Sequence, residues 1–183
     1  MIDFSLQLAN EKILLRPMKS EDFDEISKLT QDSEMWFYFT SDLSNLEVLR
    51  NWIDSAVIDR KDKKRLAFVI IEKASGKIMG STSFGNYSER DKRIEIGWTW
   101  LGKDFRGNGY NVQAKELLLN YCFEVLELER VEAKTDVLNK AARKSLLKSG
   151  FTEEGILRSH TLMTNNRRRD TIYFSVLKSE YFS

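Results

Sequence analysis

Two glycines and an arginine stand immediately before a predicted helix, in the segment Asp104–Asn111. A predicted strand precedes this segment, and the residues after it carry apolar side chains at helical spacing. The N-terminus of a helix attracts an anion, because its first N–H groups lack partners and the positive end of the dipole lies there. Gly107 and Gly109 let the backbone approach that anion, and Arg106 adds charge-assisted hydrogen bonds. The segment therefore favours a diphosphate, although a tight turn explains two glycines equally well.

Two common nucleotide-binding motifs do not fit this segment. A Walker loop needs the pattern GxxxxGK[ST], which the chain lacks. The dinucleotide-binding fingerprint needs a third glycine at the position of Val112. The glycine-rich turn alone is therefore a weak indication of a particular ligand.

A carboxylate on the preceding strand is the main candidate for proton transfer. The stretch Arg93–Leu101 alternates in polarity, with Ile94, Ile96, Trp98 and Trp100 expected on one face and Glu95, Gly97 and Thr99 on the other. Glu95 can then take a proton from a reacting group, directly or through a water molecule. An ion pair with a lysine or arginine on a solvated face is the alternative role of this side chain.

The composition indicates one domain and excludes several classes of ligand. The chain has 183 residues, 42% of them hydrophobic and 31% charged, so we expect a single domain over residues 1–183. Its 29 Lys and Arg against 28 Asp and Glu leave a net charge of +1, which provides no overall field for nucleic acid or a membrane. The basic run Arg167–Arg169 is expected to be a solvated hairpin loop, with a ribosome or nucleic-acid patch as the alternative.

The single cysteine and the single histidine exclude further kinds of site. One cysteine, Cys122, forms no internal disulfide, and one histidine, His160, leaves almost nothing to build a zinc site from, so we expect no metal. We expect Cys122 to lie in the core and His160 to be structural. No run of 18 apolar residues occurs, and acids are mixed into the apolar N-terminus, which indicates a cytoplasmic protein.

Hydrophobic periodicity predicts an α+β chain built around one mixed sheet. The expected elements, in order, are a strand at 12–15, a helix from Ser20, a helix opened by a capping box at Ser44 and Glu47, a hairpin of strands at 66–71 and 78–84, the strand at 93–101, a helix reaching Val125, a strand at 130–135, a helix from Asn139 to Gly150, and strands near 154–163 and 171–177. The chain has neither repeats nor a linker at which it divides.

The motifs together resemble one enzyme superfamily. The run Arg106-Gly107-Asn108-Gly109-Tyr110-Asn111 closely resembles the [Q/R]-x-x-G-x-[G/A] acyl-CoA signature of the GCN5-related N-acetyltransferase (GNAT) superfamily, after the fourth strand and at the start of the third helix. Further stretches resemble this family in the same order: "ILLRPMKSEDFDEISKL", "GKIMGSTSF", "IEIGWTWLGKDFRGNGY" and "RVEAKTDVLNKAARKSLLKSGF". The endings "EEGILRSH" and "RRRDTIYFSVL" are similar to the RimJ/RimL branch, which acetylates ribosomal-protein N-termini.

The resemblance implies the GNAT fold, a mixed and mostly antiparallel sheet flanked by helices, with strands four and five splayed apart. It implies acetyl-CoA as co-substrate, with pantetheine paired to the backbone of residues 98–101 and the diphosphate on the N–H groups of residues 106–111. In this family an amine attacks the thioester directly, and a backbone donor in the splay stabilises the oxyanion. The CoA-binding residues implied are Trp100, Leu101, Arg106, Gly107, Asn108, Gly109, Tyr110, Asn111 and Asn139, the last also a plausible helix N-cap.

Two positions depart from the family pattern. Asn111 replaces the small residue that ends the signature, so its side chain either crowds the diphosphate or donates a hydrogen bond to it. Ala142 replaces the serine with which this branch often protonates the departing thiolate, and Leu146 stands where other branches carry tyrosine. Ser145, one helical turn from Ala142, is a candidate substitute, beside an ordinary role as a polar helix residue. A thiolate of pKa about 8.5 also leaves with solvent protonation, so a missing acid slows turnover rather than abolishing it.

The expected acceptor is the α-amine of a protein or peptide N-terminus. At about pH 7.5 an α-amine of pKa about 8 is deprotonated almost freely, whereas a lysine or polyamine amine near 10.4 costs roughly 4 kcal/mol. Trp36 and Tyr38 are candidates for the acceptor wall, because the family builds it from this region, and packing explains them equally well. Acetylation of a small amine, such as a polyamine, amino sugar or toxic metabolite, is the alternative, and a non-catalytic CoA-binding domain is the rival function. Either enzyme is expected as a monomer or homodimer.

Overall fold

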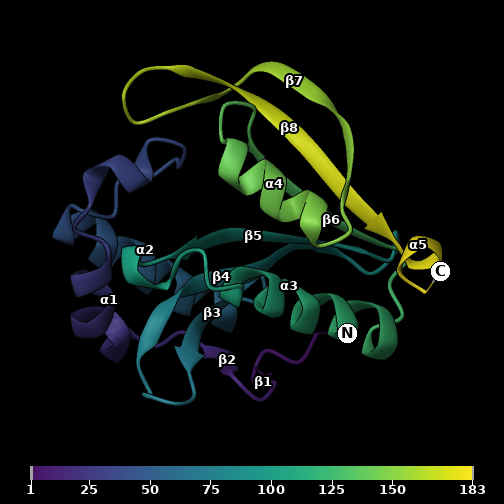
Figure 1. The fold of residues 1–183 in the computed structure, drawn as a ribbon, viewed down its shortest axis with the longest axis horizontal. Helices are drawn as coiled ribbons and strands as arrows, with labels where there is room; N and C mark the ends of the chain where they lie inside the picture. Colours follow the sequence, from purple (N-terminus) through teal and green to yellow (C-terminus); the bar gives the residue numbers. More distant parts are fainter. Residues whose placement is uncertain (1, 183) are drawn as a thin grey trace.

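Eight strands form one sheet with helices on both faces in the computed structural model, which describes residues 2–182 (Figure 1). The strands are β1 (Leu8–Ala9), β2 (Ile13–Pro17), β3 (Arg65–Glu72), β4 (Ile78–Ser88), β5 (Arg93–Leu101), β6 (Arg130–Asp136), β7 (Thr152–Leu162) and β8 (Arg168–Leu177). Their order is β1-β2-β3-β4-β5-β6-β8-β7, and every neighbouring pair is antiparallel except β5 with β6. The predicted mixed, mostly antiparallel sheet is confirmed.

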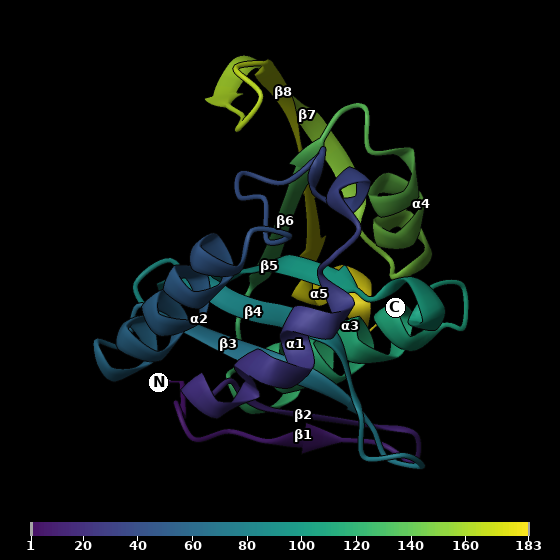
Figure 2. The same ribbon diagram turned by 90° about the vertical axis from the view of Figure 1, so that its left-hand side faces the viewer.

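Five α-helices accompany the sheet in the described part of the chain. They are α1 (Phe23–Leu29), α2 (Leu46–Lys61), α3 (Tyr110–Asn120), α4 (Lys140–Lys148) and the short α5 (Lys178–Tyr181). Figure 2 shows α1 and α2 on one side of the central strands and α3 and α4 on the other. The predicted order of elements is confirmed, with β1 and α5 as additions too short for a periodic pattern.

Each face of the sheet has its own hydrophobic core. On one face α2 buries Leu49 and Ile53 against the strands, in a cluster that includes Val69 of β3. On the other face α3 buries Leu118 in a larger cluster that includes Cys122, as expected for that cysteine. Beyond Asn120 the helix continues as a π-helical turn.

The N-terminus of α2 differs from its sequence prediction. Asn45 is the N-cap, and its side-chain oxygen accepts hydrogen bonds from the N–H groups of Glu47 and Val48. Ser44 instead donates its hydroxyl to Asp42, 2.6 Å away. The capping box predicted at Ser44 and Glu47 is therefore wrong, because the neighbouring asparagine supplies a better placed acceptor.

A bulge in β5 changes which side chains share a face. Trp98 has a left-handed backbone with φ of 53°, and the register with β4 shifts around Thr82. Ile94 and Ile96 consequently lie in the core on the α3 side, whereas Trp100 lies in the core on the α2 side. The single apolar face predicted for this strand is wrong, because an extra residue in a strand reverses the alternation that follows it.

The parallel strands β5 and β6 pair over a short distance only. Their register covers Arg93 with Arg130, Ile94 with Val131 and Glu95 with Glu132, and no pairing follows. The remainder of β5, from Ile96 on, keeps β4 as its only neighbour in the sheet. The expected splay between these two strands is therefore present, and it leaves backbone groups of β5 free to meet a ligand.

Candidate active site

The loop before α3 forms a row of unpartnered backbone donors. Among the described residues, no hydrogen bond is donated by any backbone N–H from Gly107 to Val112. Gly107 and Gly109 both have left-handed backbones, with φ of 82° and 79°. No heavy atom lies within 4 Å of the position that a Cβ on Gly107 would occupy. The glycines thus make the turn, and the same turn presents N–H groups to open space, which is the geometry that holds phosphate groups.

A groove of about 680 Å³ runs from this loop between β5 and α4. Of the CoA-binding residues predicted from the sequence, all except Asn108 line it: Trp100, Leu101, Arg106, Gly107, Gly109, Tyr110, Asn111 and Asn139. Asn139 is also the N-cap of α4, since its Oδ1 accepts a hydrogen bond of 3.1 Å from the N–H of Ala142. The structure thus gathers residues from two separate sequence motifs along one groove.

The guanidinium of Arg106 has partners within the protein. Its Nε donates to the carbonyl of Leu101 at 2.9 Å, and a terminal nitrogen lies 2.5 Å from the Sδ of Met35. These contacts tie the loop to the end of β5 and to the segment before α2. Arg106 therefore holds the loop in place, and it keeps its charge beside the row of N–H groups.

A polar cluster joins α3 to α4 beneath the groove. Asn111 donates through Nδ2 to the Oγ of Ser145 at 3.1 Å, and Lys115 Nζ donates to Asn111 Oδ1 and lies 3.5 Å from the same Oγ. Ser145 lines the groove together with Ala142. The Asn111 side chain thus turns toward α4, although the residue also lines the groove.

Lys115 was not singled out in the sequence, yet it is buried, with 4% of its surface exposed. No carboxylate lies within ion-pair distance of it among the described residues. Burial lowers the pKa of Lys115 to about 7. Lys115 follows Asn111 by four residues and adjoins the buried Ala114. This spacing is the sequence signal that places Lys115 on the inner side of α3.

A second cavity, of about 350 Å³, lies at the splay and adjoins the groove. Residues of β5 and β6 line it from Glu95 to Thr99 and from Ala133 to Thr135. Tyr38, Asn139 and Ala142 line both spaces, so the two lie side by side. A thioester lying in the groove and an amine entering by the second cavity would meet at the splay.

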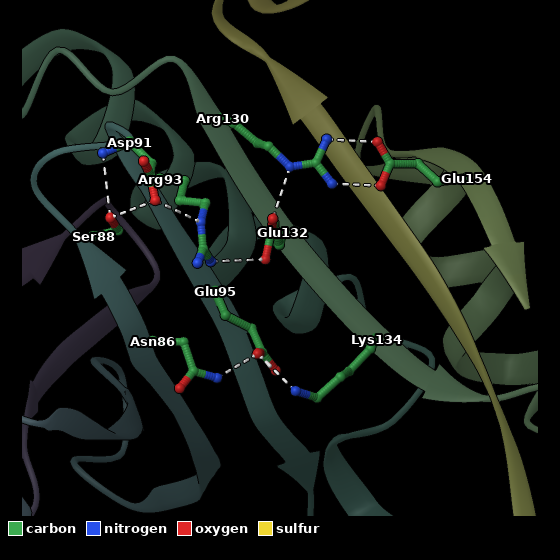
Figure 3. A network of polar contacts seen from close by, with 9 residues as sticks. All are labelled: Asn86, Ser88, Asp91, Arg93, Glu95, Arg130, Glu132, Lys134 and Glu154. Atoms are coloured by element: carbon green, nitrogen blue, oxygen red, sulfur yellow. Dashed lines mark hydrogen bonds and ion pairs between the residues drawn. The ribbon is translucent and has the colours of Figure 1, made fainter. Parts of the chain in front are cut away.

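Glu95 is buried at the inner end of the second cavity, with 5% of its surface exposed. Its Oε2 accepts hydrogen bonds from Asn86 Nδ2 at 2.8 Å and Lys134 Nζ at 2.9 Å (Figure 3). Its Oε1 has no hydrogen-bond partner among residues 2–182, and a Cβ placed on Gly97 would lie 3.1 Å from it. The ion pair with Lys134 thus occupies one oxygen of the carboxylate, and the other has no partner in this part of the chain.

The outer end of the second cavity contains two basic side chains from the β7–β8 hairpin. Arg169, with 8% of its surface exposed, donates through Nε to Thr171 Oγ1 at 3.0 Å, and His160 Nδ1 lies 3.1 Å from the same hydroxyl. Burial lowers the pKa of Arg169. The expectation of a solvated loop is wrong for this residue, because β8 begins at Arg168 and alternation turns Arg169 inward.

The two aromatic candidates for the acceptor wall lie in different places. Tyr38 lines both cavities, whereas Trp36 lines neither and packs in the core on the α2 side. The Trp36 indole donates through Nε1 to the carbonyl of Thr30 at 2.9 Å and meets the Trp100 ring edge-on at 5.5 Å. Trp36 therefore positions Trp100, while Tyr38 contacts the cavities directly.

Two kinds of feature are absent from residues 2–182. No three side chains of His, Cys, Asp or Glu gather where they could hold a metal ion. None of the helices in this range has the length and apolar character needed to cross a membrane.

Comparison with known proteins gives a family. The model of the acetyltransferase (GNAT) domain matches residues 12–152. YdaF of Bacillus subtilis, provisionally named a ribosomal N-acetyltransferase, is 29% identical over 94% of this chain and 94% of its own. Spermidine N(1)-acetyltransferase of Escherichia coli is 24% identical over 93% of this chain and 89% of its own. A crystal structure of a GCN5-related N-acetyltransferase from Brucella melitensis has a TM-score of 0.88 and 26% identity, over 97% of this chain and 80% of that one. This chain therefore belongs to the GNAT acetyltransferase family.

Proposed function

We propose that this N-acetyltransferase acts in the cytoplasm, on the α-amine of a protein or peptide N-terminus, with acetyl-CoA as donor. The observation that carries this proposal is the meeting of two cavities at the splay of β5 and β6. One of them begins at the row of free N–H groups, and the other ends at Glu95. Such an arrangement brings a thioester and an amine together and leaves the chemistry to position and local charge.

The groove suits the parts of acetyl-CoA in order. The N–H groups from Gly107 to Val112 suit a diphosphate, and the side of β5 that β6 leaves unpaired from Ile96 on suits the amides of pantetheine. Asn139, at the start of α4, faces the same groove. When bound, acetyl-CoA supplies the activated acetyl group, and the chain supplies the surface that orients it.

Glu95 is the proposed acceptor of the proton that the amine loses. Its Oε1 has no partner among residues 2–182, whereas its Oε2 is held by Asn86 and Lys134, so the carboxylate is oriented before the amine arrives. An α-amine needs little help at neutral pH, which matches a carboxylate that is already stabilised by a lysine. Direct attack of this amine on the thioester carbon then forms the C–N bond and releases the thiolate.

Ser145 is the proposed donor of a proton to that thiolate. Its Oγ accepts from Asn111, and Lys115 Nζ lies within hydrogen-bond distance of it, so its own hydroxyl proton is directed elsewhere. Ser145 lines the groove one helical turn from Ala142, the position of the usual serine. A lysine behind the hydroxyl can return the proton after each turnover.

Release of CoA in the presence of matched acceptors tests the function. We expect turnover with peptides that have a free α-amine and none with the same peptides blocked at the N-terminus. Turnover with spermidine or an amino sugar alone would replace the N-terminal acceptor by the small-amine alternative. Tight binding of acetyl-CoA with no turnover of any amine would support the non-catalytic CoA-binding domain instead.

A further inference from the structure

Arg169 brings a positive charge without a counter-charge to the second cavity. Among the described residues it forms no ion pair, and its one hydrogen bond uses Nε and Thr171. Its terminal nitrogens therefore have no partner in this part of the chain, although 92% of the residue's surface is covered. Neither of these nitrogens is among the enclosed side-chain atoms that lack a partner, so both remain open to the cavity and can donate to a ligand that enters it.

The nearby acids are already engaged. The Glu95 carboxylate is paired with Lys134 at 2.9 Å, and the buried Asp136 is paired with Arg167. Glu95 and Asp136 are the two carboxylates near enough to act on Arg169 through space. Each has one lysine or arginine of its own, so Arg169 remains as one uncompensated positive charge at the outer end of the cavity.

The position of Arg169 relative to Glu95 gives the cavity two ends of different charge. Glu95 lies at the inner end, where β5 and β6 still pair, and Arg169 lies beyond Thr171, the β8 partner of Asp136. Both side chains line the same space, together with His160. An acceptor whose amine reaches Glu95 therefore extends its other groups into the space that Arg169 also lines.

We propose that Arg169 is the anion-binding residue of the acceptor site, and that the preferred acceptor carries a carboxylate a few bonds from its amine. This inference rests on the proposed function and specifies its substrate class. Two sources share this chemistry: a peptide with an acidic residue next to its N-terminal residue, and a free amino acid through its α-carboxylate. A polyamine has the opposite character, since its second ammonium would face Arg169.

Matched acceptors test this preference directly. We expect peptides that begin Ser-Glu to have a kcat/KM about 10- to 100-fold above those that begin Ser-Gln, because a charge-assisted bidentate pair replaces a neutral contact. A free amino acid compared with its amide distinguishes the second source of the carboxylate. Equal kcat/KM for acidic and neutral acceptors, or a preference for spermidine, would overturn the inference.

Two variants connect the preference to the residue. Arg169→Met removes the charge and keeps the length, and we expect the preference for acidic acceptors to disappear while the KM for acetyl-CoA stays the same. Arg168→Met is the matched control, because Arg168 is exposed and bonds to Ser159 outside the cavity. Since Arg169→Met keeps an apolar stem in a mostly buried position, it is expected to fold, and Arg169→Lys should retain part of the preference. An unchanged preference in Arg169→Met would contradict the assignment.

A binding measurement distinguishes failure of this subsite from failure of the enzyme. In a thermal-shift titration the acidic peptide should stabilise the wild type and Arg168→Met, and stabilise Arg169→Met much less, with no turnover required. Stabilisation without acetyl transfer would keep the subsite and remove the proposed function. Acetyl transfer without any selective stabilisation or preference would keep the function and remove the subsite.

Discussion

The Nζ of Lys115 lies 3.5 Å from the Oγ of Ser145, so a buried lysine on α3 supports a hydroxyl on α4 across the floor of the groove. Asn111 completes this cluster through contacts to both side chains. These three residues join α3 to α4 by hydrogen bonds instead of apolar packing. In the proposed function, the departing thiolate lies beside them. A buried cation without a carboxylate partner makes this contact sensitive to pH.

Lys115→Met should change how stability depends on pH. The pKa of Lys115 is about 7 in the folded protein, below its ordinary value of 10.5, so the unfolded chain binds more protons between these values. Stability of the wild type therefore rises as pH increases from about 7 toward 10, by on the order of a few kcal/mol. We expect the free energy of unfolding of Lys115→Met to exceed that of the wild type by the largest margin at pH 6, and this margin to disappear by pH 10. Urea denaturation of both proteins measures it. The exposed Lys140→Met is the control, and parallel curves for wild type and Lys115→Met would contradict a lowered pKa.

Glu95→Gln should affect the chemical step. The amide keeps the shape of the side chain and removes the base, so we expect kcat to fall by about 100-fold or more with little change in CoA affinity. The loss should narrow above about pH 8, where the acceptor α-amine is already largely neutral. Steady-state kinetics across this pH range provide the measurement.

Glu132→Gln is the matched control for that experiment. Glu132 is the parallel partner of Glu95 and pairs with Arg93 and Arg130 outside both cavities (Figure 3). It should retain wild-type kinetics apart from a modest loss of stability. Full activity of Glu95→Gln at every pH would leave Glu95 as the partner of Lys134 only, and transfer would then depend on positioning and solvent.

Gly85→Ala should disturb the bulge of β5. A Cβ on Gly85 would lie 2.7 Å from Cη2 of Trp98, so the indole or the strand has to move. We expect a loss of about 1–3 kcal/mol in the free energy of unfolding and a weaker catalytic rate, because Trp98 lines the second cavity. Tryptophan fluorescence, denaturation and kinetics measure these effects. Gly155→Ala, where no atom lies within 4 Å, should change none of them, and an equally silent Gly85→Ala would show that the indole moves freely.

The order of elements could be predicted because each long element has a regular pattern. The continuous apolar run of β3 and the cap of α4 at Asn139 depend on local residues, so sequence alone locates them. The row of N–H groups at Gly107 and Gly109 follows from the position of a glycine pair between a strand and a helix. The glycine pair therefore predicts the turn, and the resemblance of the surrounding motifs adds the expectation of a CoA-binding site there.

The remaining features depend on contacts that sequence does not record. The positive φ of Trp98 has no local cause in its own residue type, and the glycine that accommodates it lies on another strand. Lys115 and Arg169 were missed as buried site residues because charged side chains are usually exposed, and only helix and strand phase places them inward. Ser145, the neighbour of Lys115 in space, comes from another helix, whereas Thr171, the partner of Arg169, lies two residues further along the same strand.

Gly109→Val tests whether the glycine turn binds phosphate or only turns the chain. Both Gly109 and Gly76 have left-handed backbones, with φ of 79° and 71°, so a β-branched side chain strains each of them to a similar extent. Gly76 lies in the turn between β3 and β4, away from the groove, and a Cβ there meets no atom within 4 Å. Gly76→Val therefore reproduces the strain without the ligand.

We expect CoA to raise the melting temperature of the wild type and of Gly76→Val equally, because a ligand that binds only the folded chain stabilises it by mass action. For Gly109→Val the increase should be largely lost, with an affinity at least about 10-fold weaker, since a side chain at the N-cap of α3 displaces the diphosphate from the free N–H groups. Isothermal titration of CoA into each folded variant gives the affinities. Equal affinities in Gly76→Val and Gly109→Val would mean that the turn needs these glycines for its backbone alone, and that the diphosphate is held elsewhere along the groove.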